Sequence, residues 1–148
     1  MIISSIRHSA FVVRNIDESL KFYSGILGLE IYVRRFEEGS FIDSLTGIKN
    51  LKLEWVKLII PQGGLIELLQ YHSHPDSEVN EKMKPSHSNK LGSSHVALTV
   101  NDLSTLYDNL INAGYTCKSK PLITENRKAK ILYAHDPDGS ILELIEDI

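Results

Sequence analysis

The chain has 148 residues, of which 42% are hydrophobic and 24% charged, and its net charge at pH 7 is −3. This balance is typical of one globular domain, and the absence of a basic stripe counts against a protein that binds nucleic acid. No apolar run approaches the roughly 20 residues that cross a bilayer, and no signal peptide is visible. A single cysteine, Cys117, fits a reducing compartment. We therefore expect a cytoplasmic protein that binds neither nucleic acid nor membrane.

Residues 1–71 are predicted to form a strand, a helix and three further strands. The first strand covers 6–13. Asn15 or Asp17 can cap the helix and Gly28 can end it. Apolar residues recur in this helix at the spacing of one helical face: Ile16, Leu20, Tyr23 and Leu27. The remaining strands are predicted over 30–36, 51–60 and 65–71.

Residues 72–94 are polar, contain two prolines, and are predicted to be a linker. His72 and His74 form an H-x-H pair that could bind a cation, but their surroundings favour solvated loop residues. His87 lies in the same segment.

Residues 95–148 repeat the order of the first half. A strand begins at His95, and a helix follows that Asn101 or Asp102 can cap and Gly114 can end. Strands are then predicted over 115–120, 130–135 and 140–145. Each half is therefore βαβββ, which places the chain in the α+β class. His135, just before a turn, is as well suited to bonding the backbone as to a chemical role.

The two halves also match residue by residue. "PQGGLIELLQ" (61–70) aligns without a gap with "PDGSILELIE" (137–146), so Glu67 coincides with Glu143. "HSAFVV" at the start of the first half aligns with "HVALTV" in the second, so His8 coincides with His95. Each half thus opens with a histidine-bearing strand and closes with a glutamate-bearing one.

Glu143 poses a problem in an apolar strand. Both faces of the strand are otherwise apolar, so we expect it to be covered on both sides and Glu143 to be buried, which is costly for an unpaired carboxylate. Any one of the four residues, taken alone, has an ordinary structural explanation. If the duplication makes them converge, two carboxylates would repel each other unless a divalent cation balanced them. Two nitrogen and two oxygen ligands suit Zn, Ni, Co, Mn or Fe better than Ca or Mg.

The sequence resembles the vicinal oxygen chelate superfamily, which includes glyoxalase I, methylmalonyl-CoA epimerase, bleomycin-resistance proteins and extradiol dioxygenases. Four segments carry the resemblance: "HSAFVVRNIDESLKFYSGILGLE", "GGLIELLQY", "SSHVALTVNDL" and "DPDGSILELIE". The resemblance implies a single domain over 1–148, in which βαβββ modules 1–71 and 95–148 form a U-shaped mixed sheet around one divalent metal. It also implies a ligand set: His8, Glu67, His95 and Glu143.

The resemblance further implies a metal-dependent lyase or isomerase that transfers a proton next to a carbonyl of a small-molecule substrate. The His/Glu/His/Glu set resembles bacterial glyoxalase I, whereas the long first half and linker are closer to the epimerases, which usually have Gln at the place of Glu67. Glu143 and, after it, Glu67 are the candidate catalytic bases. An extradiol-type dioxygenase or a non-catalytic resistance protein remains an alternative. We expect a homodimer, and the site could form within one chain or across two.

Overall fold

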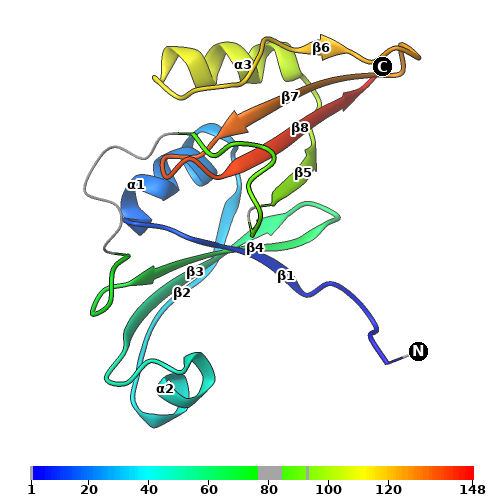
Figure 1. Cartoon of the computed structure of the whole chain (residues 1–148). Helices are drawn as coiled ribbons and strands as arrows, with labels where there is room; N and C mark the ends of the chain where they lie inside the picture. The colour runs from blue at the N-terminus through cyan, green and yellow to red at the C-terminus, as the bar shows by residue number, and fades with distance from the viewer. Residues whose placement is uncertain (1, 77–84, 93) are drawn as a thin grey trace. The chain divides into compact units, whose positions relative to one another are not determined.

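The computed structural model describes residues 2–76, 85–92 and 94–148. The chain divides into two compact units, Met1–Asn80 and Glu81–Ile148, and each contains one four-stranded sheet (Figure 1). The strand order is β1-β4-β3-β2 in the first unit and β5-β8-β7-β6 in the second. In each sheet the first and last strands of the unit pair in parallel and the other neighbours pair antiparallel. The predicted α+β class with two related mixed-sheet modules is confirmed.

The elements of the first unit follow the predicted order with one addition, the helix α2. They are β1 (His8–Val12), α1 (Ile16–Leu20), the π-helix η1 (Lys21–Ile26), β2 (Glu30–Glu38), α2 (Ser40–Thr46), β3 (Lys52–Ile60) and β4 (Gly64–Tyr71).

The described part of the second unit has one helix and four strands. Its elements are β5 (His95–Thr99), α3 (Leu103–Asn112), β6 (Leu122–Ile123), β7 (Ala129–His135) and β8 (Ile141–Asp147). Of the predicted linker over 72–94, residues 77–84 and 93 lie outside the described residues. The described Ser86 belongs to this unit, since its backbone N–H donates to the Gly139 carbonyl at 3.0 Å.

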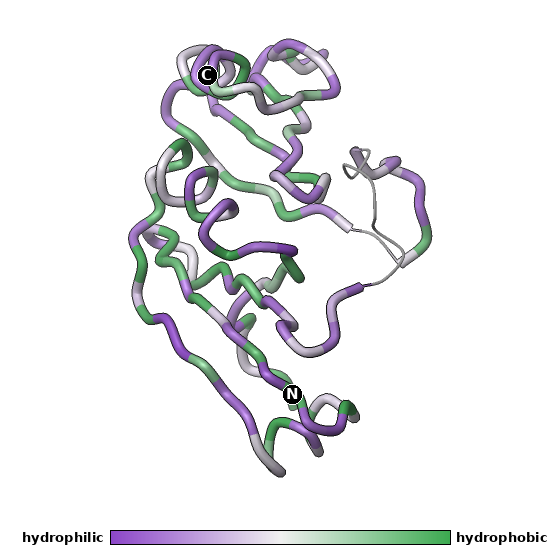
Figure 2. The backbone as a smooth tube through the Cα atoms, turned by 90° about the vertical axis from the view of Figure 1, so that its left-hand side faces the viewer, coloured by the Kyte–Doolittle hydropathy of each residue, from purple (hydrophilic) through white to green (hydrophobic). Residues whose placement is uncertain are grey.

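One face of each sheet carries the hydrophobic core. In the first unit Val56, Leu58, Ile66 and Leu68 are fully buried, and Phe11 on the same face lies 5.8 Å from the ring of Tyr23 in η1. In the second unit Leu142 and Leu144 are fully buried, as are Leu103 and Leu110 of α3. The opposite faces, which carry His8 and His95, are partly open. Figure 2 shows the corresponding mixture of hydrophobic and hydrophilic residues along the strands.

The two units also repeat their helix caps. Asn15 caps α1 and Asp102 caps α3, each by accepting a backbone N–H with its side chain. The backbone N–H of the first residue of each helix donates to a side chain of the last strand. Ile16 donates to Gln70 at 2.8 Å, and Leu103 donates to Glu146 at 2.9 Å. These contacts fix each helix against the strand that carries the glutamate.

The residues that the first helix buries differ from the predicted set. After one turn it widens into η1, where the N–H of Leu27 donates to the carbonyl of Phe22. The wider turn places both Phe22 and Tyr23 in the core, while Leu20 and Leu27 are only half-buried. Gly28 follows with a positive φ of 73°, as expected for the residue that ends a helix.

The strand predicted over 115–120 is wrong. In this segment only an isolated bridge joins Cys117 to Ala134, and the regular strand β6 begins after Pro121. Proline has no N–H to donate to a ladder, so it separates the two short contacts with β7.

Helix α2 was not predicted, because its seven residues are too few to show a helical period. Gly39 precedes it and Gly47 ends it in the left-handed conformation, and these glycines were the available signal. Its buried Ile42 packs in a cluster with Leu51 and Leu53 of the chain that leads into β3. α2 therefore covers one end of the partly open face of the first sheet.

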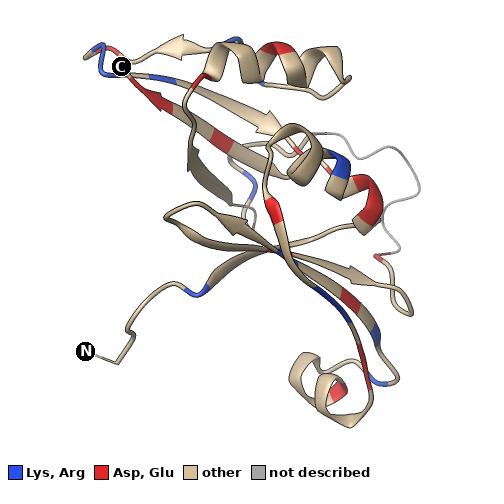
Figure 3. Ribbon diagram, turned by 180° about the vertical axis from the view of Figure 1, so that it is seen from behind, with Lys and Arg blue, Asp and Glu red and all other residues tan. Residues whose placement is uncertain are grey.

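Acidic and basic residues are both spread along the chain (Figure 3). Within the described ranges, no helix is long and apolar enough to cross a membrane.

A buried carboxylate, Glu54, ties the strands of the first sheet together. Glu54 is 2% exposed. One of its carboxylate oxygens accepts a hydrogen bond from Nε of Arg34, and Nε2 of His72 lies 2.8 Å from the other oxygen. Arg34 also donates to Asp17 at 2.7 Å, and the bonds to Asp17 and Glu54 raise the pKa of Arg34. His72 lies beyond β4 and is exposed, as expected of a loop residue, but its ring also bonds Glu54 and stacks on Phe36.

Replacing Glu54 by Gln should destabilise the fold, because Arg34 and His72 lose the buried charged acceptor that they share. We expect the free energy of unfolding in urea to fall by about 2 kcal/mol. The matched control is Glu18→Gln, which removes the charge from the exposed pair with Lys21 and should cost only a few tenths of a kcal/mol. Equal losses in the two variants would contradict a structural role for the Glu54 network.

Candidate metal centre

In the first unit, parallel pairing of β1 and β4 brings His8 next to Glu67. Ala10 lies opposite Glu67 in the ladder, so His8 is two residues away on the same face. His8 Nε2 lies 3.2 Å from Glu67 Oε2. The Glu67 side chain is 12% exposed, and Nδ1 of His8 is buried without a hydrogen-bond partner among the described residues.

The second unit builds the same pair in the same way. Ala97 lies opposite Glu143 in the parallel ladder of β5 and β8, and His95 is two residues before Ala97. His95 Nε2 lies 3.1 Å from Glu143 Oε2. The ring of Tyr133 is 5.2 Å from the ring of His95. The duplication seen in the sequence therefore extends to strand register, side-chain pairing and distance.

The expected full burial of Glu143 is wrong. Its side chain is 17% exposed, and the fully buried neighbours Leu142 and Leu144 lie on the other face of β8. On the face of Glu143, Ile141 is buried but Ile145 is only partly buried. The carboxylate is thus partly accessible, which lowers the cost of keeping it charged.

The two glutamates have different residues opposite them on the neighbouring antiparallel strand. In the first sheet Lys57 lies opposite Glu67, and its Nζ is 3.4 Å from Glu67 Oε1. The same Nζ is 4.7 Å from the ring centroid of Trp55, close enough for a cation–π contact. In the second sheet the residue opposite Glu143 is Tyr133. One carboxylate therefore has a cation beside it and the other a neutral phenol.

The donor chemistry of the four residues fits a divalent transition metal. Within each half, one imidazole nitrogen faces one carboxylate oxygen, and the carboxylate is partly shielded from water. Together they make two nitrogen and two oxygen donors with two negative charges, which suits Zn, Ni, Co, Mn or Fe. Among the described residues, no three or more His, Cys, Asp or Glu side chains form a group that could hold an ion. The structure brings the four candidates together as two separate His–Glu pairs.

The remaining histidines lie outside these pairs. His74 is exposed, and its Nδ1 is 2.8 Å from Ser73 Oγ. His87 is also exposed. His135 is 4% exposed, and its Nδ1 lies 3.0 Å from Thr116 Oγ1 and 3.2 Å from the Thr116 carbonyl. His135 thus takes the backbone-bonding role that the sequence left open.

The chain is similar to known proteins of one superfamily. The family described as the Glyoxalase/Bleomycin resistance protein/Dioxygenase superfamily matches residues 5–144. The chain is 26% identical over 146 residues to the lactoylglutathione lyase of Schizosaccharomyces pombe, with 95% of the chain and 46% of the relative covered. It is also 26% identical over 152 residues to glyoxalase I of Saccharomyces cerevisiae, with coverages of 95% and 44%. The chain thus spans less than half of the length of these curated relatives.

A solved structure shows the same fold. A glyoxalase family protein from Bacillus cereus superposes with a TM-score of 0.85 at 23% sequence identity, and the match covers 100% of this chain and 99% of the other.

The buried His135 should make stability depend on pH. Burial first, and the nearby Lys118 second, lower the pKa of His135 below its ordinary value near 6.5. The unfolded chain therefore binds a proton at a pH where the folded protein does not, so stability is lost as the pH falls below about 6.5. The slope from this one group is at most about 1.4 kcal/mol per pH unit.

Urea unfolding between pH 8 and pH 5 measures this effect. His135→Gln should flatten the decline of the unfolding free energy below pH 6.5, whereas His74→Gln, at an exposed site, should follow the wild type. A wild-type slope retained in His135→Gln would assign the acid sensitivity to other groups.

Proposed function

The chain belongs to the Glyoxalase/Bleomycin resistance protein/Dioxygenase superfamily, and on that basis we propose that it is a divalent-metal-dependent lyase or isomerase. Its reaction would be proton transfer at a carbon next to a carbonyl. The observation that carries this proposal is the duplicated His–Glu pair, at 3.2 Å in one half and 3.1 Å in the other, in the same strand register. The family name also covers resistance proteins and dioxygenases, so the activity rests on the residues.

We propose that the two pairs hold one ion between them, with His8 and Glu67 as ligands from one half and His95 and Glu143 from the other. Neither pair completes a ligand set by itself, whereas the two together balance the charge of a divalent ion. A dioxygenase of the two-His, one-carboxylate type needs open positions on its iron, and a fourth protein ligand would fill one of them. The four donors therefore favour the lyase or isomerase.

The side chains can divide the chemistry among themselves. A bound divalent ion supplies positive charge that polarises the substrate carbonyl and stabilises the negative charge formed on deprotonation. Glu143 accepts the proton from the carbon next to that carbonyl, since its carboxylate is partly accessible and, within the described residues, has its polar contact with His95. Returning the proton to a neighbouring atom, or to the other face of the carbon, completes an isomerisation. Glu67 is the second candidate base.

Two substrate classes are compatible with this chemistry. The curated relatives are named lactoylglutathione lyase and glyoxalase I, which favours a glutathione-linked 2-oxoaldehyde adduct. An acyl-CoA carrying an acidic α-hydrogen is the second class, although the epimerases usually have Gln in place of Glu67. We favour the first class because the ligand set matches it at all four positions. The homodimer and the cytoplasmic location stay predictions.

Metal binding is the first test of the proposal. Wild-type protein treated with a chelator and then titrated with Zn²⁺ should gain thermal stability, because the ion binds only the folded site. His95→Ala should weaken Zn²⁺ binding by 10²-fold or more, on the order of the loss of one ligand. His74→Ala, which removes an exposed histidine outside the pairs, should bind like the wild type. A loss in His74→Ala and none in His95→Ala would move the site to the segment after β4.

The catalytic base is tested by exchange in heavy water. With S-lactoylglutathione as the probe, the wild type should incorporate deuterium at the α-carbon of the lactoyl group. Glu143→Gln keeps the shape and a ligand oxygen but cannot accept the proton, so exchange should fall by about 10²-fold or more while Zn²⁺ is retained. Glu67→Gln should show a smaller loss. Undiminished exchange in Glu143→Gln would assign the base elsewhere, with Glu67 next in line.

A further inference from the structure

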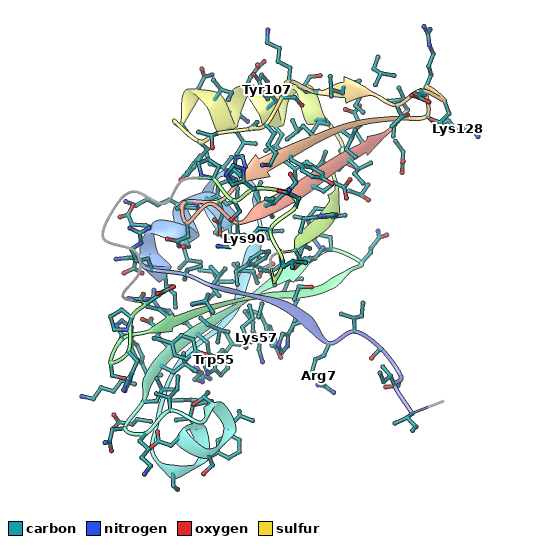
Figure 4. All side chains as sticks on the ribbon, in the orientation of Figure 1. Arg7, Trp55, Lys57, Lys90, Tyr107 and Lys128 are labelled. Carbon is teal, nitrogen blue, oxygen red and sulfur yellow. The ribbon has the colours of Figure 1, made fainter. Side chains whose placement is uncertain are left out.

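Lys57 is the residue that breaks the symmetry of the duplicated pairs. It lies in the middle of β3 directly opposite Glu67, and its side chain is 24% exposed. Its ammonium is held between the ring of Trp55, at 4.7 Å, and Oε1 of Glu67, at 3.4 Å. Figure 4 shows Trp55 and Lys57 close together on the side of the sheet that α2 occupies. The cation is therefore fixed on the face that carries the metal ligands.

Within the described part of the second half, no cation takes the corresponding place beside Glu143. The residue opposite it is Tyr133. Lys118 donates to the Ser86 carbonyl at 2.8 Å. Lys130 pairs with Glu146 at 3.2 Å, and both lie on the other face of their strands.

The two oxygens of Glu67 consequently have different partners. Oε1 faces Lys57, whereas Oε2 faces His8 at 3.2 Å. A carboxylate held by a cation through one oxygen and by a ligand histidine at the other has little freedom to turn. Within the described part of the chain, Glu143 has an interaction of this kind at one oxygen, with His95.

From this difference we infer that Lys57 is a positioning residue: it holds Glu67 as a fixed metal ligand and so leaves Glu143 as the carboxylate that moves during the reaction. This inference rests on the proposed function. It explains how two carboxylates at equivalent places can take unequal roles, since a base must loosen from its ligand position to reach the substrate.

A double-mutant cycle on Zn²⁺ affinity tests this inference without any substrate. Lys57→Met keeps the side-chain stem over Trp55 and removes the charge. If Lys57 acts through Glu67, the effects of Lys57→Met and Glu67→Gln should depart from additivity by about fivefold or more. Lys57→Met and Glu143→Gln should be additive within about twofold. The matched control, Lys130→Met, should be additive with both, and Lys57→Arg, which keeps the cation, should bind Zn²⁺ like the wild type.

A double variant that swaps Lys57 and Tyr133 gives the second measurement. In Lys57→Tyr/Tyr133→Lys the cation moves beside Glu143, so deuterium exchange should become more sensitive to Glu67→Gln than to Glu143→Gln. Such a reversal is not expected of a residue that only supports the fold.

The outcomes separate the inference from the function. Equal coupling of Lys57 to the two glutamates, or none to Glu67, in a wild type that binds Zn²⁺ would overturn the inference and leave the proposed metal site standing. A wild type that binds no Zn²⁺, Ni²⁺, Co²⁺ or Mn²⁺ would remove the proposed function and the inference with it.

Discussion

The parallel pairing of the first and last strand of each unit is the constraint on which the candidate site depends. In β1–β4 and in β5–β8 the same register sets the histidine two residues from the position opposite the glutamate. A shift of one residue would turn one of the two side chains to the core face. The N-terminal helix caps support this register, because Gln70 and Glu146, three residues after each glutamate, bind the first turn of α1 and α3. Fold and site are thus specified by the same contacts.

Duplication alone would give two equivalent His–Glu pairs, but the surroundings of the two pairs differ. The difference lies one strand away from the ligands, where the ladder places Lys57 beside one carboxylate and Tyr133 beside the other. A single residue change at matching positions can therefore assign roles within a symmetric ligand set. The Glu54 network lies on the opposite face of the first sheet. It joins β2, β3 and the chain after β4.

The sequence was sufficient for the features that repeat. The paired motifs around Glu67 and Glu143 predicted the two modules, the strands that carry the ligands and the faces on which they lie, because a duplicated period-2 pattern leaves one consistent register. It failed where a single local feature decides the outcome. Pro121 interrupts the strand predicted over 115–120, and Phe22 of the widened turn η1, which the predicted helical face omits, lies in the core. The contact of His72 with Glu54 was not predicted, because the two residues are 18 positions apart and no local pattern reveals it.

The central claim is that the two His–Glu pairs share one metal ion. Native mass spectrometry of the chelator-treated protein, titrated with Zn²⁺, counts the ions bound to each chain. Sharing predicts saturation at one ion per chain, and loss of that same ion in both His8→Ala and His95→Ala. Two ions per chain, with each histidine variant losing only one of them, would show that the pairs bind independently and would contradict the claim.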